Sequence, residues 1–362
     1  MLIDKETSTR IDLLRFPLAY GVVWAHAMHP AARLGYWRQD GLAGGVVFFE
    51  NFISWVLCHQ TLPMFLLISG FLFFKDYELT YKCTMHKVQR RVRSLLIPFL
   101  LWNMIAFVCI LCIQTIRPDL APYFNQDRTL IRDYGILDFF NGLLGIRDHY
   151  LYDLPTWFIR DIFLMALLSP LVWTILKKLP TVLSLLLLGV LMFSKPLCGF
   201  QHTVIIFYSL GALISIKSIR LEWIDKWGRE ITIVFIILGL LQAYFKTIDI
   251  DYWWLPRLVG VFGVAAVWSI SKRLLASERA VRVLLKLAAF SFILYAVHSP
   301  VVLNAVRGLF HVLLPYNTVG VLTAYVMAPA VAVILLVCGG HLLRRQAPAV
   351  FSVLNGRRWT KR

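Results

Sequence analysis

Apolar segments of membrane-spanning length recur along almost the whole chain, and this pattern restricts the fold more than any single motif does. Hydrophobic residues make up 59% of the 362 positions and charged residues only 16%. No soluble domain of this size needs so much apolar sequence. Inside a bilayer the backbone must satisfy its own hydrogen bonds, which a helix does. We therefore expect an all-α polytopic membrane protein.

We predict ten membrane spans, separated by interruptions that carry charged or turn-forming residues. Their expected bounds are 12–29, 46–74, 94–116, 155–176, 180–194, 202–216, 231–246, 256–271, 285–310 and 320–343. The second and ninth are longer than a membrane requires, so we expect them to tilt, bend or protrude. The whole chain, residues 1–362, is expected to form one integral-membrane domain without an appended soluble domain.

The distribution of charge predicts the orientation of these spans. With the N-terminus inside, most of the 37 Lys and Arg residues fall in the tails and loops on that same side. This is the positive-inside pattern, so we expect a multi-pass protein of the cell inner membrane with both termini in the cytoplasm. The formal net charge of +17 is spread over several juxtamembrane segments. It therefore indicates contact with membrane lipids and not with nucleic acid.

Arg15 and His26 lie eleven positions apart in the first span and share one helical face. Eleven steps of about 100° fall within about 20° of three turns, and the rise between them is about 16 Å. Such side chains are costly in a bilayer unless they line a polar cavity. The alternative is an arginine that snorkels to the interface and a histidine that bonds a neighbouring helix. His29 precedes Pro30 at the expected helix exit, which suits an interfacial histidine.

The densest basic run, residues 75–93, comes just before the third span. Arg90 and Arg93 are three positions apart, hence close together if the helix begins early, and Arg91 lies between them. Guanidinium groups bind phosphates bidentately and keep their charge, so the run suits a cytoplasmic phosphate-bearing donor such as a coenzyme A thioester. Ordinary topology determinants have the same composition.

Several motifs, in order along the chain, together resemble acyltransferase family 3, the membrane O-acyltransferases of bacterial surface polysaccharides and related glycans. They are Arg15-x10-His26, LPMFLLISGFLFFK (62–75), Arg90-x-x-Arg93 with the following LLIPFLLWN, LPTWFIRDIF (154–163), SLGAL (209–213) and FSFILYAVHSP (290–300). The resemblance implies transfer of an acyl group, expected to be acetyl from cytoplasmic acetyl-CoA. The implied acceptor is a hydroxyl of a cell-surface or lipid-linked glycan.

The resemblance also implies roles for the residues of the matching motifs. His26 would either take the proton of the acceptor hydroxyl or carry the acyl group as an acyl-imidazole. Arg15 would lie on the donor side, with Asp12 one turn below it as a possible partner. The residues that would bind the CoA phosphates are Arg90, Arg93 and Arg91.

Later spans supply five further candidates for contact with the acceptor: Trp157, Arg160, Asp161, Tyr295 and His298. Trp157 suits an interface anchor as well as a sugar-stacking platform. Arg160 and Asp161 either pair with other spans or line the acceptor cavity. Tyr295 and His298 suit hydrogen bonds between helices as well as contact with substrate.

Outside the spans, the apolar stretch at 136–146 is too short to cross a membrane and suits a re-entrant or surface-lying segment. No metal site is expected, because the CxxC spacing of Cys109 and Cys112 lies in an apolar helix with no second pair. Two other classes of protein remain open. A secondary transporter or exporter would use Arg15 and His26 to line its cavity, although the usual pair of broken helices is not evident. An assembly protein would need no aligned Arg and His.

Overall fold

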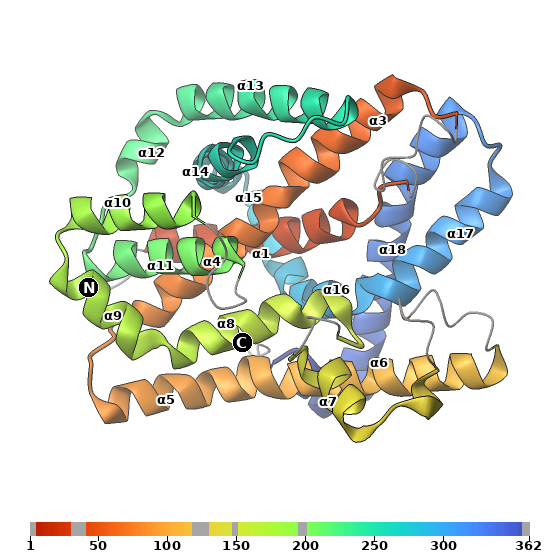
Figure 1. Cartoon of the computed structure of the whole chain (residues 1–362), viewed down its shortest axis with the longest axis horizontal. Coiled ribbons are helices and arrows are strands. Elements are labelled where there is room, and N and C mark those ends of the chain that lie inside the picture. The colour runs from red at the N-terminus through yellow and green to blue at the C-terminus, as the bar shows by residue number, and fades with distance from the viewer. Residues whose placement is uncertain (1–4, 30–40, 118–129, 147–150, 195–200, 357–362) are drawn as a thin grey trace.

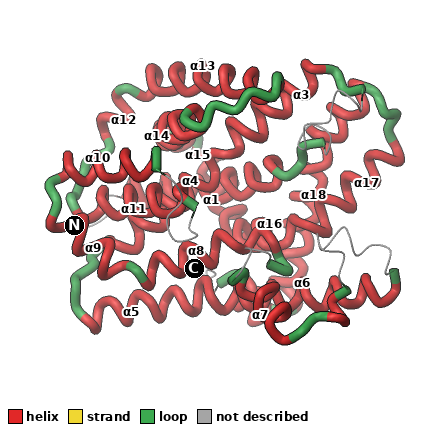
Figure 2. Tube along the Cα trace, in the orientation of Figure 1, coloured by secondary structure: helices red, strands yellow, loops and turns green. Residues whose placement is uncertain are grey.

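The computed structural model describes residues 5–29, 41–117, 130–146, 151–194 and 201–356. These residues form helices joined by loops and contain no strand (Figure 2), so the predicted all-α class is confirmed for them. Each predicted span coincides with one helix or with a run of consecutive helices. Figure 1 shows α5 (Tyr81–Arg91) and α6 (Ile97–Ile116) along the lower edge of the bundle and α13 (Gly228–Thr247) along the upper edge.

Six segments of the described chain are long and apolar enough to cross a membrane: Gly44–Phe74, Tyr81–Ile116, Gly228–Thr247, Leu255–Leu275 (α14), Glu278–Val297 and Thr318–Gln346 (α18). A seventh candidate is α8 with its preceding turn (Leu154–Leu167) followed by α9 (Ser169–Lys178), which are bent by 61°. Helices α10 (Thr181–Met192) and α11 (His202–Ile216) are apolar but shorter. The total of ten spans and the cytoplasmic termini therefore remain predictions.

The first predicted span corresponds to α1 (Lys5–Ala25), whose first half carries a buried arginine. Arg10 in this half is only 3% exposed. Its guanidinium forms two hydrogen bonds of 2.7 and 2.8 Å with the carboxylate of Asp225 in α12 (Glu222–Lys226), and it lies 4.0 Å from the ring centre of Trp268 in α14. A buried guanidinium requires such a partner, so Arg10 fixes α1 against α12 and α14.

The two long predicted spans change helix type along their length. The second consists of α3 (Gly44–Glu50), the π-helix η1 (Asn51–Leu57), the 3-10 helix η2 (Cys58–Gln60) and α4 (Thr61–Phe74). The ninth consists of α15 (Glu278–Leu287), η7 (Ala288–Phe290), α16 (Ser291–Val297), η8 (His298–Val302) and α17 (Leu303–Leu313). The ninth span is bent within η8, in agreement with the expectation from its length.

The other elements are η3 (Val92–Leu96) between α5 and α6, η5 (Ile131–Asp133), α7 (Ile136–Leu144), η6 (Leu154–Thr156) before α8 (Trp157–Leu167), and α19 (Pro348–Leu354). Helix α7 forms from the apolar stretch predicted to lie on a surface. Its Ile136, Leu137 and Phe140 side chains are exposed. Much of the loop around it, at 118–129 and 147–150, lies outside the described residues.

Close packing of α4 against α11 brings two of the family-like motifs together. A Cβ atom on Gly70 would overlap the carbonyl oxygen of Tyr208, and one on Gly211 would overlap that of Leu67. Small residues allow this approach of two backbones, which is a common way to join helices within a membrane. The glycines of the ISGF and SLGAL motifs therefore have a packing role.

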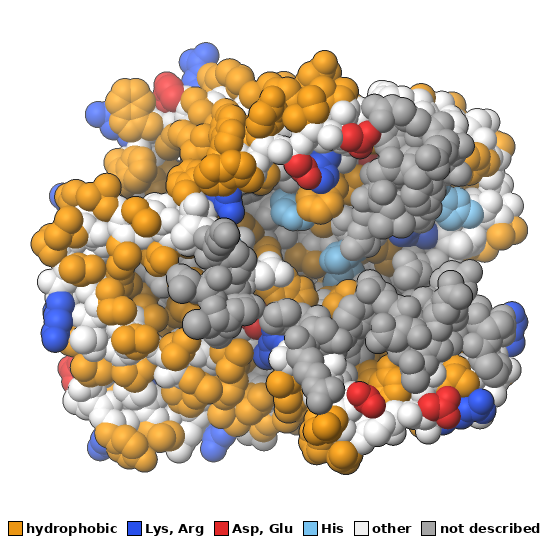
Figure 3. All heavy atoms as spheres, viewed as in Figure 1, with side chains coloured by type: hydrophobic (Ala, Val, Ile, Leu, Met, Phe, Trp, Pro, Cys, Tyr) orange, Lys and Arg blue, Asp and Glu red, His pale blue; other side chains and the backbone are white. Residues whose placement is uncertain are grey.

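The described surface carries many large apolar side chains that a soluble protein would bury. Figure 3 shows them over broad areas of one face. On three of the helices they include Val182, Leu186 and Val190 of α10, Ile237 and Leu240 of α13, and Ile334 and Leu335 of α18. Exposed apolar surface on this scale fits contact with lipid.

Candidate active site

The ninth span is broken where a serine precedes a proline. Helix α16 ends at Val297, and the backbone of Ser299 leaves the helical region, with φ −128° and ψ 148°. A proline disfavours the helical conformation of the residue before it, so Pro300 accounts for the extended backbone of Ser299. Proline also lacks the N–H that would bond to the preceding turn. The sequence VHSP therefore encodes the break.

His298 lies at this break and is fully buried. Its Nδ1 is 2.7 Å from the carbonyl oxygen of Tyr295, which in an unbroken helix would accept from the N–H of Ser299. A carbonyl oxygen only accepts, so Nδ1 carries the proton and donates. The Nε2 atom of the neutral ring then keeps its lone pair. Within the described part of the chain, Nε2 has no hydrogen-bond partner.

The imidazole of His26 packs beside that of His298. His26 occupies the turn just after the end of α1, where its N–H donates to the carbonyl oxygen of Val23. The centroids of the two rings are 5.2 Å apart and their planes are inclined by 48°. Helix α1 packs against α16, which brings together two residues from the first and ninth predicted spans. A neutral imidazole has one N–H donor and one nitrogen lone pair, so two rings in contact can relay a hydrogen bond from one to the other.

A hydrogen-bond network fixes the wall behind the histidine pair. The hydroxyl of Tyr295 donates to the carbonyl oxygen of Pro155. Asn103, fully buried in α6, holds the turn that contains this proline. Its Nδ2 donates to Oγ1 of Thr156 at 2.8 Å, and its Oδ1 accepts from the N–H of Asp153 at 3.0 Å. The third, fourth and ninth predicted spans are thereby joined at one point.

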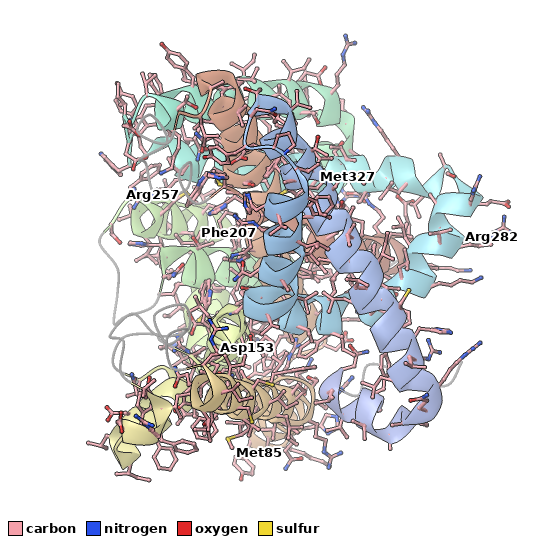
Figure 4. The ribbon with its side chains drawn as sticks, turned by 90° about the vertical axis from the view of Figure 1, so that its right-hand side faces the viewer. Met85, Asp153, Phe207, Arg257, Arg282 and Met327 are labelled. Atoms are coloured by element: carbon pink, nitrogen blue, oxygen red, sulfur yellow. The ribbon has the colours of Figure 1, made fainter. Side chains whose placement is uncertain are left out.

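Two buried carboxyl groups lie on the same side of this network. Asp153 is only 3% exposed, and Figure 4 shows it between the layer of α6 and α7 and the helices above. Burial raises the pKa of Asp153 well above its usual range, because the ionised form loses its hydration. Asp161 is paired at 2.8 Å with the neighbouring Arg160, whose guanidinium also donates to the carbonyl oxygens of Leu144 and Gly145. Arg160 and Asp161 thus hold the C-terminal end of α7 to α8.

Trp157 and Tyr295 belong to the apolar surroundings of this wall. Trp157 is partly buried and packs on the main core, with its ring 6.2 Å from that of Phe158. The ring of Tyr295 is 5.8 Å from Phe158, and its hydroxyl lies within electrostatic range of Asp153 and Asp161. The structure therefore brings Tyr295, His298, Arg160 and Asp161 into one region, as the sequence analysis grouped them.

Arg15 lies in the middle of α1, eleven residues before His26. Its Nη2 atom is 3.2 Å from Oδ1 of Asp12, the partner expected one turn below, and its side chain is 39% exposed. The pair leaves Arg15 accessible, so its guanidinium is available to a ligand as well as to Asp12. A half-exposed pair of this kind contributes little to stability by itself.

The three arginines of the basic run take two different directions. Arg91 is turned towards the bundle, where its Nη2 donates to the carbonyl oxygen of Ser69 at 3.3 Å and its guanidinium lies 5.7 Å from the ring centre of Phe73. Arg15 acts on Arg91 electrostatically. The side chains of Arg90 and Arg93 are exposed. The helix does begin early, at Tyr81, but the residue that it presents to Arg15 is Arg91.

Glu50 is a buried charged residue that the sequence analysis did not single out. It is fully buried at the end of α3, where one carboxylate oxygen accepts the N–H of His29 at 3.0 Å and the other has no hydrogen-bond partner among the described residues. Arg307 acts on it electrostatically. His29 is itself only 9% exposed, with its ring 5.6 Å from that of His311. A glutamate inside the apolar run GGVVFFENF was the available signal, because a charge there needs partners.

The described residues thus combine a half-exposed arginine in the middle of α1 with two packed imidazoles beyond its end. This arrangement can bind an anionic group at one end and move a proton at the other. Among these residues no group of three or more His, Cys, Asp or Glu side chains is placed to hold a metal ion. The pattern is that of a polytopic membrane protein with a pair of histidines inside its helical bundle.

The comparisons with known proteins identify the family. The family model described as "Acyltransferase domain" matches residues 8–340, so the chain belongs to acyltransferase family 3, as its motifs predicted. The chain is also similar to the succinoglycan biosynthesis protein ExoH of Rhizobium meliloti (strain 1021). The two are 27% identical over 373 residues, which cover 98% of this chain and 94% of the relative. No solved structure matches the chain. The chain is therefore a membrane acyltransferase.

The helix break generates the first testable prediction. Replacement of Pro300 by alanine removes the restriction on Ser299, so the helix can close and the Ser299 N–H can displace His298 from the carbonyl oxygen of Tyr295. A misplaced catalytic group commonly costs roughly 100-fold in rate. We expect Pro300→Ala to lower acyl transfer by about this factor while the melting temperature of the purified protein is unchanged or higher.

The matched control for this variant is Pro329→Ala, since Pro329 lies inside a different helix, α18, and does not precede or follow the extended Ser299. The control should retain most of the activity. Equal activity of Pro300→Ala and wild type would show that the break is not needed for the reaction.

Proposed function

We propose that this acyltransferase moves an acetyl group from cytoplasmic acetyl-CoA to a hydroxyl of a cell-surface or lipid-linked glycan, with His26 at the reacting atoms. The observation that carries the proposal is the contact between the rings of His26 and His298 at the break in the ninth span. A polysaccharide acceptor is supported by the relative, which is named for succinoglycan biosynthesis. The inner membrane is the proposed location, on the basis of the charge bias of the loops.

In the proposed reaction the C–S bond of the thioester breaks and a C–O ester bond forms. His26 takes the proton of the attacking hydroxyl and delivers it to the sulfur, so the products are the glycan ester and the free thiol of CoA. His298 acts through His26 and is a positioning residue. In the reacting state that we propose, its Nε2 lone pair, which has no partner among the described residues, would accept from one nitrogen of the His26 ring and leave the other nitrogen to the hydroxyl. Tyr295 fixes the direction of this chain of bonds, because its carbonyl oxygen holds Nδ1 of His298.

The donor is proposed to bind at the basic end of the bundle. Arg15 and Arg91 are partly shielded from solvent and close enough to act on each other, so a phosphate between them would relieve the repulsion of two like charges. Arg90 and Arg93 stand at the rim in this proposal, where they attract the anionic donor but make weaker contacts. The thioester then points along α1 from Arg15 towards His26.

The other candidate residues support the acceptor side of the same site. Tyr295 and the Arg160–Asp161 pair hold the wall behind His298 through the bonds described above. Trp157 contributes its partly buried ring to that wall. We propose that these residues shape the approach of the glycan to His26.

Replacement of His26 tests the proposal. Loss of a general base costs about 10²–10⁴-fold in rate, and His26 lies in a turn outside the main core, so the fold should persist. We expect purified His26→Ala to lose acyl transfer by at least this range, measured as labelled acetyl groups moved from acetyl-CoA to a membrane glycan fraction. His298→Gln, whose amide oxygen can still accept a hydrogen bond, should retain more activity than His298→Ala.

The matched control is His86→Ala, which removes an exposed imidazole of α5. It should transfer at the wild-type rate. Wild-type turnover by a folded His26→Ala protein would overturn the assignment of His26 to the reaction.

The three arginines point in different directions, so we expect them to contribute unequally to the affinity for the donor. A charge-assisted hydrogen bond that is shielded from water contributes roughly 1.5–3 kcal/mol, whereas an exposed ion pair contributes about 1 kcal/mol or less. We therefore expect Arg91→Ala to weaken CoA binding by more than Arg90→Ala or Arg93→Ala, as measured by titration calorimetry.

Arg132→Ala serves as the control, because Arg132 is an exposed arginine of the loop beyond the third span. It should leave the affinity for CoA unchanged. An unchanged affinity in the Arg90, Arg91 and Arg93 triple variant would mean that these residues set the topology and do not bind the donor.

A further inference from the structure

A cavity of about 110 Å³ lies between the second predicted span and the junction of α13 with α14. Its walls come from Trp55 and His59 on one side and from the end of α13, the following loop and the start of α14 on the other. Figure 3 shows a hollow in the middle of one face, where a histidine side chain lies near charged side chains of both signs. The predicted topology puts this cavity in the outer half of the membrane.

Two buried polar atoms of the residues that line the cavity have no partner. Gln242 is only 8% exposed, and its side-chain Oε1 accepts no hydrogen bond from the described residues. The Nε1 of Trp55 likewise donates to no described atom. An unmet buried polar group costs about 1–3 kcal/mol, so one such acceptor and one such donor on side chains that line the same cavity favour a polar occupant.

Aromatic rings and a cation form the rest of the wall. The ring of His59 lies 4.6 Å from that of Trp55, and the ammonium group of Lys246 lies 4.7 Å from the Trp55 ring centre. Phe245 and Tyr252 meet edge to face at 4.7 Å on the opposite side. The cavity therefore has apolar ring faces within and polar atoms at fixed points, which is the composition of a site for a small, partly polar molecule.

The size of the cavity restricts what enters it. A cavity needs a volume of roughly 15 Å³ to hold one water molecule, and pockets that enclose a drug-sized ligand have volumes from roughly 300 Å³ upwards. A volume of about 110 Å³ suits a single six-membered ring better than an extended chain.

One residue of the cavity wall, Trp55, also packs near the proposed reaction site. Trp55 packs in one apolar cluster with Ala27 and Met28, the two residues that follow His26 along the chain. A molecule against the other side of Trp55 is therefore near the end of α1 at which His26 lies.

We propose that this cavity binds one sugar ring of the acceptor, next to the ring whose hydroxyl is acylated. A pyranose has C–H faces that pack on aromatic rings and a rim of hydroxyl groups that both donate and accept. Gln242 Oε1 would accept from one hydroxyl and Trp55 Nε1 would donate to another. A lipid chain satisfies neither atom, and a CoA phosphate would meet the single cation Lys246 beside Asp251, 3.6 Å away. The inference rests on the proposed function, since it names part of the acceptor of that site.

Sugar binding by the whole purified protein tests the inference without measuring catalysis. The probe is methyl β-D-glucopyranoside, followed by saturation-transfer NMR in a detergent that has no sugar headgroup. The variants are Gln242→Leu, which removes the unmet acceptor at similar volume, and Tyr252→Ala, which removes an aromatic wall. The control is Trp253→Ala, because Trp253 is 62% exposed, adjacent to Tyr252 and not part of the cavity wall.

We expect saturable binding in the wild type, a loss of roughly five- to tenfold in affinity in Gln242→Leu and in Tyr252→Ala, and wild-type affinity in the control. Absence of saturable binding in the wild type, or equal affinity in all four proteins, would overturn the inference. A protein that binds the sugar in this pattern but transfers no acyl group would support the cavity assignment and contradict the proposed function. Failure of the sugar-binding inference can therefore be distinguished from failure of the proposed acyltransferase function.

Discussion

The candidate site depends on the restriction that Pro300 places on Ser299. Because the residue before a proline avoids the helical region, the ninth span cannot continue through this point and Ser299 becomes extended. The carbonyl oxygen of Tyr295 then accepts from the side chain of His298, which fixes the protonated nitrogen of that ring. A single backbone restriction thus determines both the position of a buried imidazole and its tautomer, and His26 packs against it.

Buried polar contacts hold the surrounding helices in the arrangement that this pair requires. Arg10 fixes the start of α1 to α12 and α14, and Asn103 joins α6 to the turn before α8. A buried polar group left without its partner is more costly than a lost apolar contact, so such networks favour one arrangement of the helices. Helix α1 connects the two halves of the proposed reaction, because Arg15 in its middle lies near Arg91 on the proposed donor side and His26 follows its end.

Sequence patterns predicted the features that depend on residues close to one another along the chain. Apolar run length predicted the all-α class, and Asp12, one turn before Arg15, is its partner as expected. The excess length of the ninth span predicted that it tilts, bends or protrudes, and the structure shows a bend. Those patterns could not predict contacts between segments that are far apart in the sequence. The pairing of His26 with His298 depends on how α1 packs on α16, and the inward direction of Arg91 depends on how the third segment, with its π-helical turn at Val92–Leu96, packs on α4. Because α10 and α11 are shorter than the other candidate spans, the total of ten spans stays a prediction.

Transfer across a sealed membrane tests the central claim most directly, since a donor from one side and an acceptor from the other must meet at His26. Purified protein is placed in liposomes with labelled acetyl-CoA on one side and the glycan fraction only on the other. The account predicts that label appears on the glycan with the wild type and not with His26→Ala, while the membrane stays impermeable to CoA. Transfer that occurs only when both substrates share one side would contradict a site open to both faces through the bundle.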